Sequence, residues 1–251
     1  MKQAAKIVIV TGGSRGIGAS TARECARRGM GVILTYNSNR GSAEEVVASI
    51  TADGGKAVAL ALDVARTATF GAFRDQVRAA LKEHWGRDTF DALVNNAGHG
   101  LFVPITDVTE AQFDGLFAVH LKGPFFLAQT LLPSMADGGH IVNVTSATTR
   151  IATAGVAPYA SFKGGLEVLT RYLAKELGDR RIRANAVSPG AIRTELGGGL
   201  NDELEALLAG QTALGRVGEP GDVAGVIASL LADENRWVNA QSIEVSGGYA
   251  L

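Results

Sequence analysis

The amino-terminal stretch joins a buried strand, a glycine-rich turn and a helix, and this order restricts the fold more than any other feature. Residues 6–10 end in Ile-Val-Ile-Val, a continuous β-branched run typical of a strand covered on both faces. The turn Thr11–Gly18 follows, with glycines spaced G-x-x-x-G-x-G, and a helix continues to about Arg28. Glycines let a backbone approach a pyrophosphate, and a helix N-terminus offers unpaired N–H groups. The unit predicts a nucleotide site, with a plain tight turn as the alternative.

Strand and helix patterns alternate along the rest of the chain. We expect strands at 6–10, 32–36, 56–62, 92–94, 141–145, 182–187 and 242–245. We expect helices at 44–52, 70–84, 109–135 with a kink at Gly123-Pro124, 157–177, 203–209 and 220–232. This alternation predicts a single α/β domain over residues 1–251, with a doubly wound, Rossmann-like parallel sheet and helices on both faces. In such sheets the ligand crevice lies at the carboxyl ends of the strands.

The composition excludes several classes of protein. With 251 residues, 46% hydrophobic and 20% charged, the chain suits one large α/β domain and is unlike a disordered segment. A net charge of −1 predicts no binding to nucleic acid or to an anionic membrane, and no apolar run approaches the roughly 20 residues of a membrane helix. Because Cys25 is the only cysteine and the four histidines lie far apart, we expect no disulfide, no metal and a cytoplasmic location.

The end of the second expected strand bears on the choice of cofactor. An Asp or Glu at this place holds the ribose hydroxyls of NAD, whereas an arginine accommodates the 2′-phosphate of NADP. The sequence reads Thr-Tyr-Asn-Ser-Asn-Arg over 35–40, with no acid before Glu44. Arg15 and Arg40 are therefore candidate phosphate partners, and we expect NADP(H) in preference to NAD(H). The competing interpretation is that both arginines are solvated surface charges.

Tyr159 and Lys163 form a second candidate site, because four residues on a helix place two side chains on one face. A lysine close to a tyrosine hydroxyl stabilises the phenolate and lowers the pKa of the tyrosine from about 10, which suits a general acid. On its own the spacing also fits an ordinary surface pair. The expected strand ends favour the catalytic interpretation, because they direct a whole set of residues to one crevice: the glycine-rich turn, Asp63, Asn95, Ser146 and Pro189.

Five motifs in a fixed order give the chain a resemblance to the short-chain dehydrogenase/reductase family, closest to its 3-oxoacyl-carrier-protein reductase and ketoreductase group. The motifs are Thr11–Gly18, Asn95–Gly98, Ser146, Tyr159-x-x-x-Lys163 and Ser188-Pro189-Gly190. The resemblance covers essentially the whole chain. It implies an NADP-dependent oxidoreductase that interconverts a carbonyl, either a ketone or a 3-oxoacyl group, and a secondary alcohol.

The resemblance also implies roles for individual residues. Tyr159 would supply the proton to the carbonyl oxygen, Lys163 would lower its pKa and bond the nicotinamide ribose, and Ser146 would bond the substrate oxygen. The implied cofactor contacts are Gly12, Ser14, Arg15, Gly16, Ile17 and Gly18 in the turn; Tyr36, Asn37, Ser38 and Arg40 after the second strand; Asp63 and Val64 at the adenine; Asn95, Ala97 and Gly98 at the adenosine ribose; and Pro189, Gly190, Ile192 and Thr194 at the nicotinamide, with Tyr159 and Lys163. For Asp63, a helix cap is the alternative.

One position departs from the family pattern. The family's fourth catalytic residue is an asparagine, thought to hold a water that links the lysine to solvent. The matching segment 117–123 carries His120 in that place. Since histidine accepts, donates and titrates near neutrality, we expect His120 to bond that water or to replace it. The alternative, a histidine that is only packed in its helix, fits the sequence equally well.

Further expectations concern the substrate and the assembly. We expect a mobile substrate lid at about 191–215, since Gly197-Gly198-Gly199 offers hinge freedom, with a plain surface loop as the alternative. The substrate is expected to be a small carbonyl or alcohol that the pocket residues do not identify. Family members usually form tetramers, which implies a homotetramer. Two other functions remain open: a catalytically weak NAD(P)-binding regulator, and an epimerase or dehydratase on the same fold.

Overall fold

The β-branched runs of the sequence lie at the centre of a seven-stranded sheet in the computed structural model, which describes residues 5–251. The strands are β1 (Ile7–Val10), β2 (Gly31–Tyr36), β3 (Ala57–Ala61), β4 (Phe90–Asn95), β5 (Met135–Val144), β6 (Arg183–Pro189) and β7 (Ser242–Val245). All neighbouring strands are parallel, in the order β3-β2-β1-β4-β5-β6-β7. The order reverses between β1 and β4, which confirms the doubly wound fold class.

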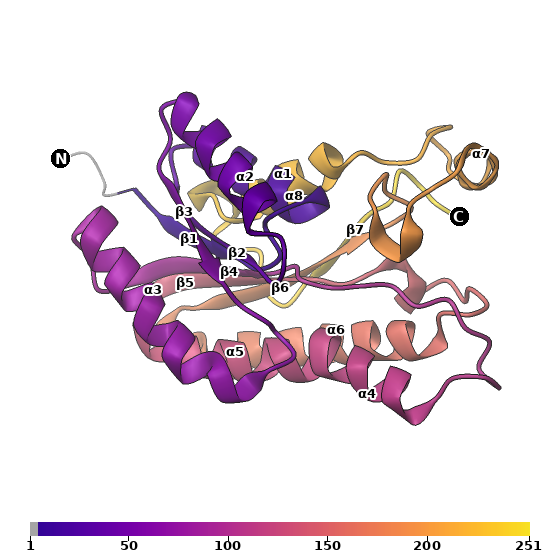
Figure 1. Ribbon diagram of the computed structural model, residues 1–251, viewed down its shortest axis with the longest axis horizontal. Helices are drawn as coiled ribbons and strands as arrows, with labels where there is room; N and C mark the ends of the chain where they lie inside the picture. Colours follow the sequence, from indigo (N-terminus) through magenta and orange to yellow (C-terminus); the bar gives the residue numbers. More distant parts are fainter. Residues whose placement is uncertain (1–4) are drawn as a thin grey trace.

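Helices cover both faces of this sheet (Figure 1). On one face lie α1 (Gly16–Arg27), α2 (Arg40–Ala52) and α8 (Pro220–Leu230); on the other lie α3 (Phe70–Trp85), α4 (Glu110–Phe117), α5 (Gly123–Leu131) and α6 (Ala157–Glu176). The short α7 (Asp202–Gly210) lies near the C-terminus, beyond the sheet. Side chains of β1 alternate between two cores, Val8 and Val10 toward α1 and Ile7 and Ile9 toward α3. No helix within residues 5–251 is long and apolar enough to span a membrane.

The helical segment expected over 109–135, with a kink or break at Gly123-Pro124, is interrupted just before that place and ends earlier than expected. The helix α4 ends at Phe117, a π-helical turn covers Ala118–Lys122, and α5 then runs only to Leu131. Pro124 occupies the first turn of α5 and has no N–H to donate, so the irregular turn falls just before it. Met135 already pairs with Phe90 as the first residue of β5, which makes this strand longer than expected.

Other boundaries differ by a few residues, and one of these differences affects the candidate site. The helix α2 begins at Arg40, four residues before the predicted start, because the Asn39 side chain accepts the N–H of Ser42 over 3.0 Å and caps the helix. Arg40 therefore lies in the first helical turn, whereas the sequence placed it in a loop. The strand β7 has the predicted bounds.

The loops that leave the carboxyl ends of the strands are joined by backbone hydrogen bonds. The N–H of Thr11 donates to the carbonyl of Val94, and the N–H of Thr145 donates to the carbonyl of Val187. These bonds extend the sheet by one residue beyond β1 and β5. They bring the segments after β1, β4, β5 and β6 to one edge, where the candidate site is built.

Candidate active site

The glycine-rich turn is packed so closely that a side chain has no room at Gly12, Gly13 or Gly18. Gly12 has a φ of +63°, and a Cβ there would lie 2.9 Å from the Cα of Ala97. A Cβ on Gly18 would lie 2.1 Å from the carbonyl oxygen of Gly12. Arg15 precedes α1, and its side chain makes no cap hydrogen bond to the helix. Uncapped N–H groups at a helix start beside a bare backbone turn fit a pyrophosphate.

Asn96 joins this turn to the end of β4. Its Nδ2 donates to the carbonyls of Thr11 (2.9 Å) and Gly12 (3.2 Å). In return, the Thr11 hydroxyl accepts the N–H groups of Asn96 (2.9 Å) and Ala97 (3.0 Å). The floor of the crevice is thus fixed by four hydrogen bonds between the β1 and β4 loops.

Asn95 occupies a different environment from the one that the sequence suggested. Its side chain is buried and donates to Oδ1 of Asn143 over 2.8 Å, and Asn143 donates to the hydroxyl of Thr170 over 2.9 Å. The amide therefore joins β4, β5 and α6 inside the core. Only the backbone of Asn95 remains for a contact to a ribose.

The two arginines expected at the adenosine phosphate are both paired with carboxylates. Arg15 donates to Oε2 of Glu195 over 2.8 Å, and Arg40 donates to Oε1 of Glu44 over 2.6 Å. All four side chains are exposed, so each pair contributes little to stability and can exchange partners. Asp63 accepts the N–H of Ala65 over 2.9 Å, which makes it a turn-stabilising residue and not a helix cap.

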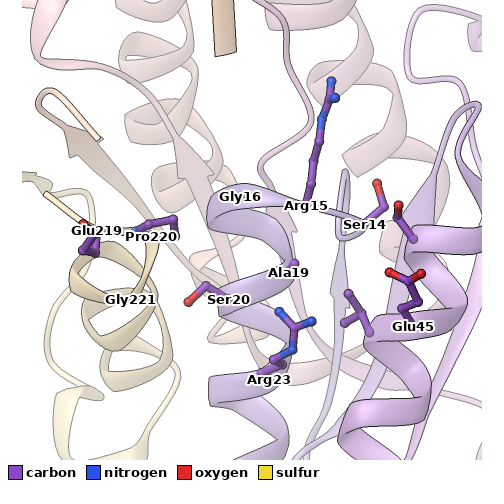
Figure 2. Close-up of a pocket in the computed structure, with 12 residues that line it drawn as sticks. Ser14, Arg15, Gly16, Ala19, Ser20, Arg23, Glu45, Glu219, Pro220 and Gly221 are labelled. Carbon is purple, nitrogen blue, oxygen red and sulfur yellow. The ribbon is translucent and has the colours of Figure 1, made fainter. Parts of the chain in front are cut away.

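A cavity of about 510 Å³ adjoins the glycine-rich turn on the outer side of α1 (Figure 2). Its lining comes from the turn and from α1, α2 and the start of α8, and includes Ser14, Arg15, Arg23, Ser42 and Glu45. In Figure 2, Arg23 and Glu45 lie on the two helices that flank this space, while Arg15 extends away from them. The cavity lies next to the expected adenosine phosphate and away from α6.

The segment after β6 lies over the turn. A Cβ on Gly16 would be 3.4 Å from Cγ2 of Thr194. Further along, a Cβ on Gly197 would be 2.6 Å from Cε2 of Phe102, an exposed residue of the loop after β4. The expected lid therefore contacts both the glycine-rich turn and the loop after β4. Of the other positions expected near the nicotinamide, Pro189 ends β6, Gly190 lies against Ser246, and Ile192 pairs with Gly218.

Tyr159 and Lys163 lie one turn apart on α6, with Lys163 almost completely buried. The Lys163 Nζ donates to the carbonyl of Val144 over 2.7 Å and lies over the Tyr159 ring, 5.6 Å from its centroid. Burial lowers the pKa of Lys163 to about 7. It also raises the pKa of Tyr159, and a side-chain contact with Ser146 opposes that rise without cancelling it. Desolvation is thus the first cause of the shift at Tyr159, and a lowering of its pKa by Lys163 stays a prediction.

His120 lies in the π-helical turn, buried beneath the site. Its Nε2 bonds the carbonyl of His99 over 2.8 Å, and its ring meets the Tyr159 ring edge-on with centroids 5.0 Å apart. Burial, reinforced by the Lys163 charge, holds the pKa of His120 well below its usual value. A neutral imidazole that donates from Nε2 has an acceptor at Nδ1. That Nδ1 is buried and has no partner among residues 5–251.

Two residues complete the site: Thr148, expected only as part of the pocket wall, and Glu167, which the sequence did not single out. Thr148 contacts Ser146 with both its N–H (3.2 Å) and its hydroxyl (2.9 Å). Glu167, one turn beyond Lys163, accepts the hydroxyls of Thr145 (3.2 Å) and Thr149 (3.0 Å) on a single oxygen. The only available signals were the position of Thr148 two residues after Ser146 and the spacing of four residues between Lys163 and Glu167.

Comparison with known proteins supports the same class. Residues 12–250 match a family model described as enoyl-(acyl carrier protein) reductase. An uncharacterized oxidoreductase of Methylorubrum extorquens is 41% identical over 97% of both chains, and the tetrahydroxynaphthalene reductase PfmaG of Pestalotiopsis fici is 34% identical over 98% of this chain and 91% of that one.

Solved structures agree. The angucycline C-6 ketoreductase LanV with bound NADP superposes with a TM-score of 0.94 at 35% identity, covering 98% of this chain and 95% of its own. The reductase LugOII, which catalyses keto-reduction at C1 during lugdunomycin biosynthesis, gives 0.94 at 39% identity with complete coverage of both chains. The chain belongs to the short-chain dehydrogenase/reductase family and is an oxidoreductase.

The buried amine of Lys163 predicts a pH-dependent stability. Between its pKa of about 7 in the folded chain and about 10.4 in the unfolded chain, the unfolded state binds more protons, so stability should rise with pH. Lys163→Met removes this dependence. In denaturant titrations of the ligand-free protein, the excess stability of the variant should be largest below pH 7. It should then shrink by about 1.4 kcal/mol per pH unit toward pH ~10. A difference that stays constant with pH contradicts the shifted pKa.

Proposed function

We propose that this chain is an NADP(H)-dependent reductase that interconverts a small-molecule ketone or 3-oxoacyl carbonyl and a secondary alcohol. The observation that carries the proposal is that Ser146, which follows β5, and Tyr159 and the buried Lys163 of α6 come together at the carboxyl edge of the sheet, where Lys163 Nζ bonds the carbonyl of Val144. Two hydroxyls that share one place suit a single reacting oxygen, as a carbonyl has. The relatives named as ketoreductases and hydroxynaphthalene reductases support this chemistry over the enoyl reduction in the description of the family model.

Each catalytic residue has a distinct task in this proposal. The cofactor, when bound, supplies the hydride to the carbonyl carbon. Ser146 donates a hydrogen bond to the carbonyl oxygen as it gains negative charge, and Tyr159 transfers its proton to that oxygen. The Tyr159 phenolate that results lies beside Lys163, whose ammonium form stabilises it. For alcohol oxidation the same residues act in the opposite direction.

The cofactor would lie along the edge from the glycine-rich turn to Thr194. Gly12 to Gly18 would hold the pyrophosphate, Asp63, Val64 and the backbone of Asn95 to Gly98 the adenosine, and Pro189 to Thr194 the nicotinamide. NADP(H) is favoured over NAD(H) because Arg15 and Arg40 are exposed cations that can exchange their carboxylate partners for a 2′-phosphate. The strand β2 ends at the nearby Tyr36, and neither Tyr36 nor the following Asn37 and Ser38 is acidic.

The segment at about 191–215 is proposed as the substrate lid within a single catalytic domain. Its residues Thr194 and Gly197 lie against Gly16 and Phe102, which supports a position across the crevice. Four of its leucines are exposed: Leu196, Leu204, Leu207 and Leu214. The relatives named for hydroxynaphthalenes and angucyclines make fused-ring ketones the first substrates to test. The buried thiol of Cys25, the only cysteine, suits the reducing cytoplasm.

Turnover assays test this function directly. With NADPH and a panel of fused-ring ketones, small ketones and 3-oxoacyl thioesters, we expect at least one substrate to oxidise NADPH, with a higher kcat/KM than with NADH. Tyr159→Phe should lower kcat by at least about 10²-fold, because the proton donor is lost, while the Kd for NADPH stays nearly unchanged.

Three results would contradict parts of the proposal. A kcat/KM that favours NADH excludes the cofactor preference. Full activity of Tyr159→Phe excludes the assigned proton donor. Tight NADPH binding without turnover of any carbonyl favours the alternative function, a catalytically weak NAD(P)-binding regulator.

We also propose that His120 takes the place of the family's relay asparagine. Its ring is fixed by the bond to His99 and kept neutral by burial, so the unpartnered Nδ1 is an acceptor held close to the Tyr159 ring. Such an acceptor can bond a water that passes protons between Lys163 and solvent, or can act in place of that water.

Substitutions at His120 separate this role from packing. His120→Ala should lower kcat at least about tenfold and change the pH–rate profile. This loss is a small part of the rate factor of about 10²–10⁴ that general acid–base catalysis contributes. His120→Asn, which restores an amide, should recover most of the activity with a profile that no longer includes the imidazole. If His120→Ala matches wild type in activity and profile, His120 has no part in the mechanism.

The proposed assembly is a homotetramer. Apolar side chains are exposed on α4, α5 and α6, which lie together on one face: Phe113, Phe117, Phe125, Phe126, Val168 and Tyr172. At one edge of the sheet, β7 is the last strand, and Trp237, five residues before it, is 96% exposed. Two separate apolar surfaces on one chain suit two two-fold interfaces, as a tetramer with this symmetry requires. Sedimentation velocity at micromolar concentration should show a tetramer; a monomer would contradict this assembly.

A further inference from the structure

One neighbour, Thr148, occupies both acceptor sites of the Ser146 hydroxyl. The N–H of Thr148 donates to Ser146 Oγ over 3.2 Å, and Thr148 Oγ1 donates to the same oxygen over 2.9 Å. A serine hydroxyl oxygen has two lone pairs and carries one proton. With both lone pairs occupied, the proton is all that Ser146 has left to offer another group.

That proton has a partner in Tyr159. Because Thr148 occupies both lone pairs of Ser146 Oγ, the Ser146 hydroxyl can only donate in its contact with Tyr159. A donated hydrogen bond stabilises the phenolate, which agrees with a Ser146 contact that opposes the rise of the Tyr159 pKa caused by burial. The two contacts therefore run in one direction, from Thr148 to Ser146 and from Ser146 toward Tyr159.

We propose that Thr148 is a positioning residue that fixes the direction in which Ser146 donates its proton. The inference rests on the proposed carbonyl reduction, in which the oxygen that Ser146 meets becomes negative and needs a donor. Without Thr148, the Ser146 hydroxyl can also rotate and accept a bond from Tyr159, which would stabilise the neutral phenol. Donation by Thr148 in addition polarises the serine O–H and strengthens it as a donor.

The backbone around Thr148 is held from the helix that carries Tyr159. Thr148 lies in the single 3₁₀ turn Ala147–Thr149, and the Thr149 hydroxyl bonds both the carbonyl of Ser146 (2.9 Å) and Glu167 of α6 (3.0 Å). Glu167 also accepts the hydroxyls of Thr145 and Ser242. The donor at Thr148 is thus fixed relative to α6 and does not depend on a mobile loop.

A matched pair of variants tests the proposal. Thr148→Val keeps the shape of the side chain but removes its hydroxyl, whereas Thr148→Ser keeps the hydroxyl. The first readout is the titration of Tyr159, followed by phenolate absorbance after a rapid pH jump. Tyr159→Phe identifies its signal among those of the other tyrosines, Tyr36, Tyr172 and Tyr249. Thr148→Val should raise the pKa of Tyr159 by about half a unit to one unit, and Thr148→Ser should leave it within about 0.2 units of wild type.

The second readout is turnover with the best ketone. Thr148→Val should lower kcat about three- to tenfold, the effect of one net hydrogen bond, with an unchanged Kd for NADPH, and Thr148→Ser should restore kcat. A Tyr159 titration that is the same in Thr148→Val as in wild type overturns the proposal, as does an equal shift in both variants. If wild type reduces no carbonyl, the proposed function fails, and the titration still decides the role of Thr148.

Discussion

The hydrogen bonds between the ends of β1 and β4 are the interactions on which the site depends. These two strands flank the point at which the order of the sheet reverses, and there the backbone groups beyond the strands have no further strand to pair with. The Thr11 hydroxyl and the Asn96 amide supply the missing partners. They also hold the two loops so close that Gly12 fits against Ala97 only without a side chain. The bare backbone that suits a pyrophosphate is a consequence of this contact.

At the other end of the crevice, burial of ionisable side chains costs folding free energy. Lys163 and Tyr159 are both removed from water, and desolvation favours the uncharged form of each: the pKa of the amine falls and that of the phenol rises. Among residues 5–251, the buried Lys163 Nζ bonds only the carbonyl of Val144, so the amine opposes folding. Such unfavourable burial is typical of functional sites, where proton transfer needs pKa values shifted from those in water.

The sequence was sufficient for those features that depend on short-range pattern. Continuous apolar runs and glycine placement predicted the parallel sheet, and the strand ends predicted which residues meet at one edge. Features that depend on tertiary surroundings were not predictable. The Asn95 amide turns into the core because Asn143 lies across from it on β5, and burial, which the sequence does not show, raises the pKa of Tyr159. The π-helical turn before Pro124 had only the proline as a signal.

His120 shows how a departure from the family pattern is accommodated. The residue lies in the π-helical turn, and its ring packs against Gly98: a Cβ on Gly98 would lie 2.7 Å from Cε1 of the imidazole. The ring can occupy its position beside Tyr159 because residue 98 has no side chain. In the sequence, Gly98 belongs to the cofactor motif and His120 to a helix, with no visible link between them. In the structure Gly98 lies against the His120 ring, so the same loop after β4 that packs on the glycine-rich turn also leaves the space for His120.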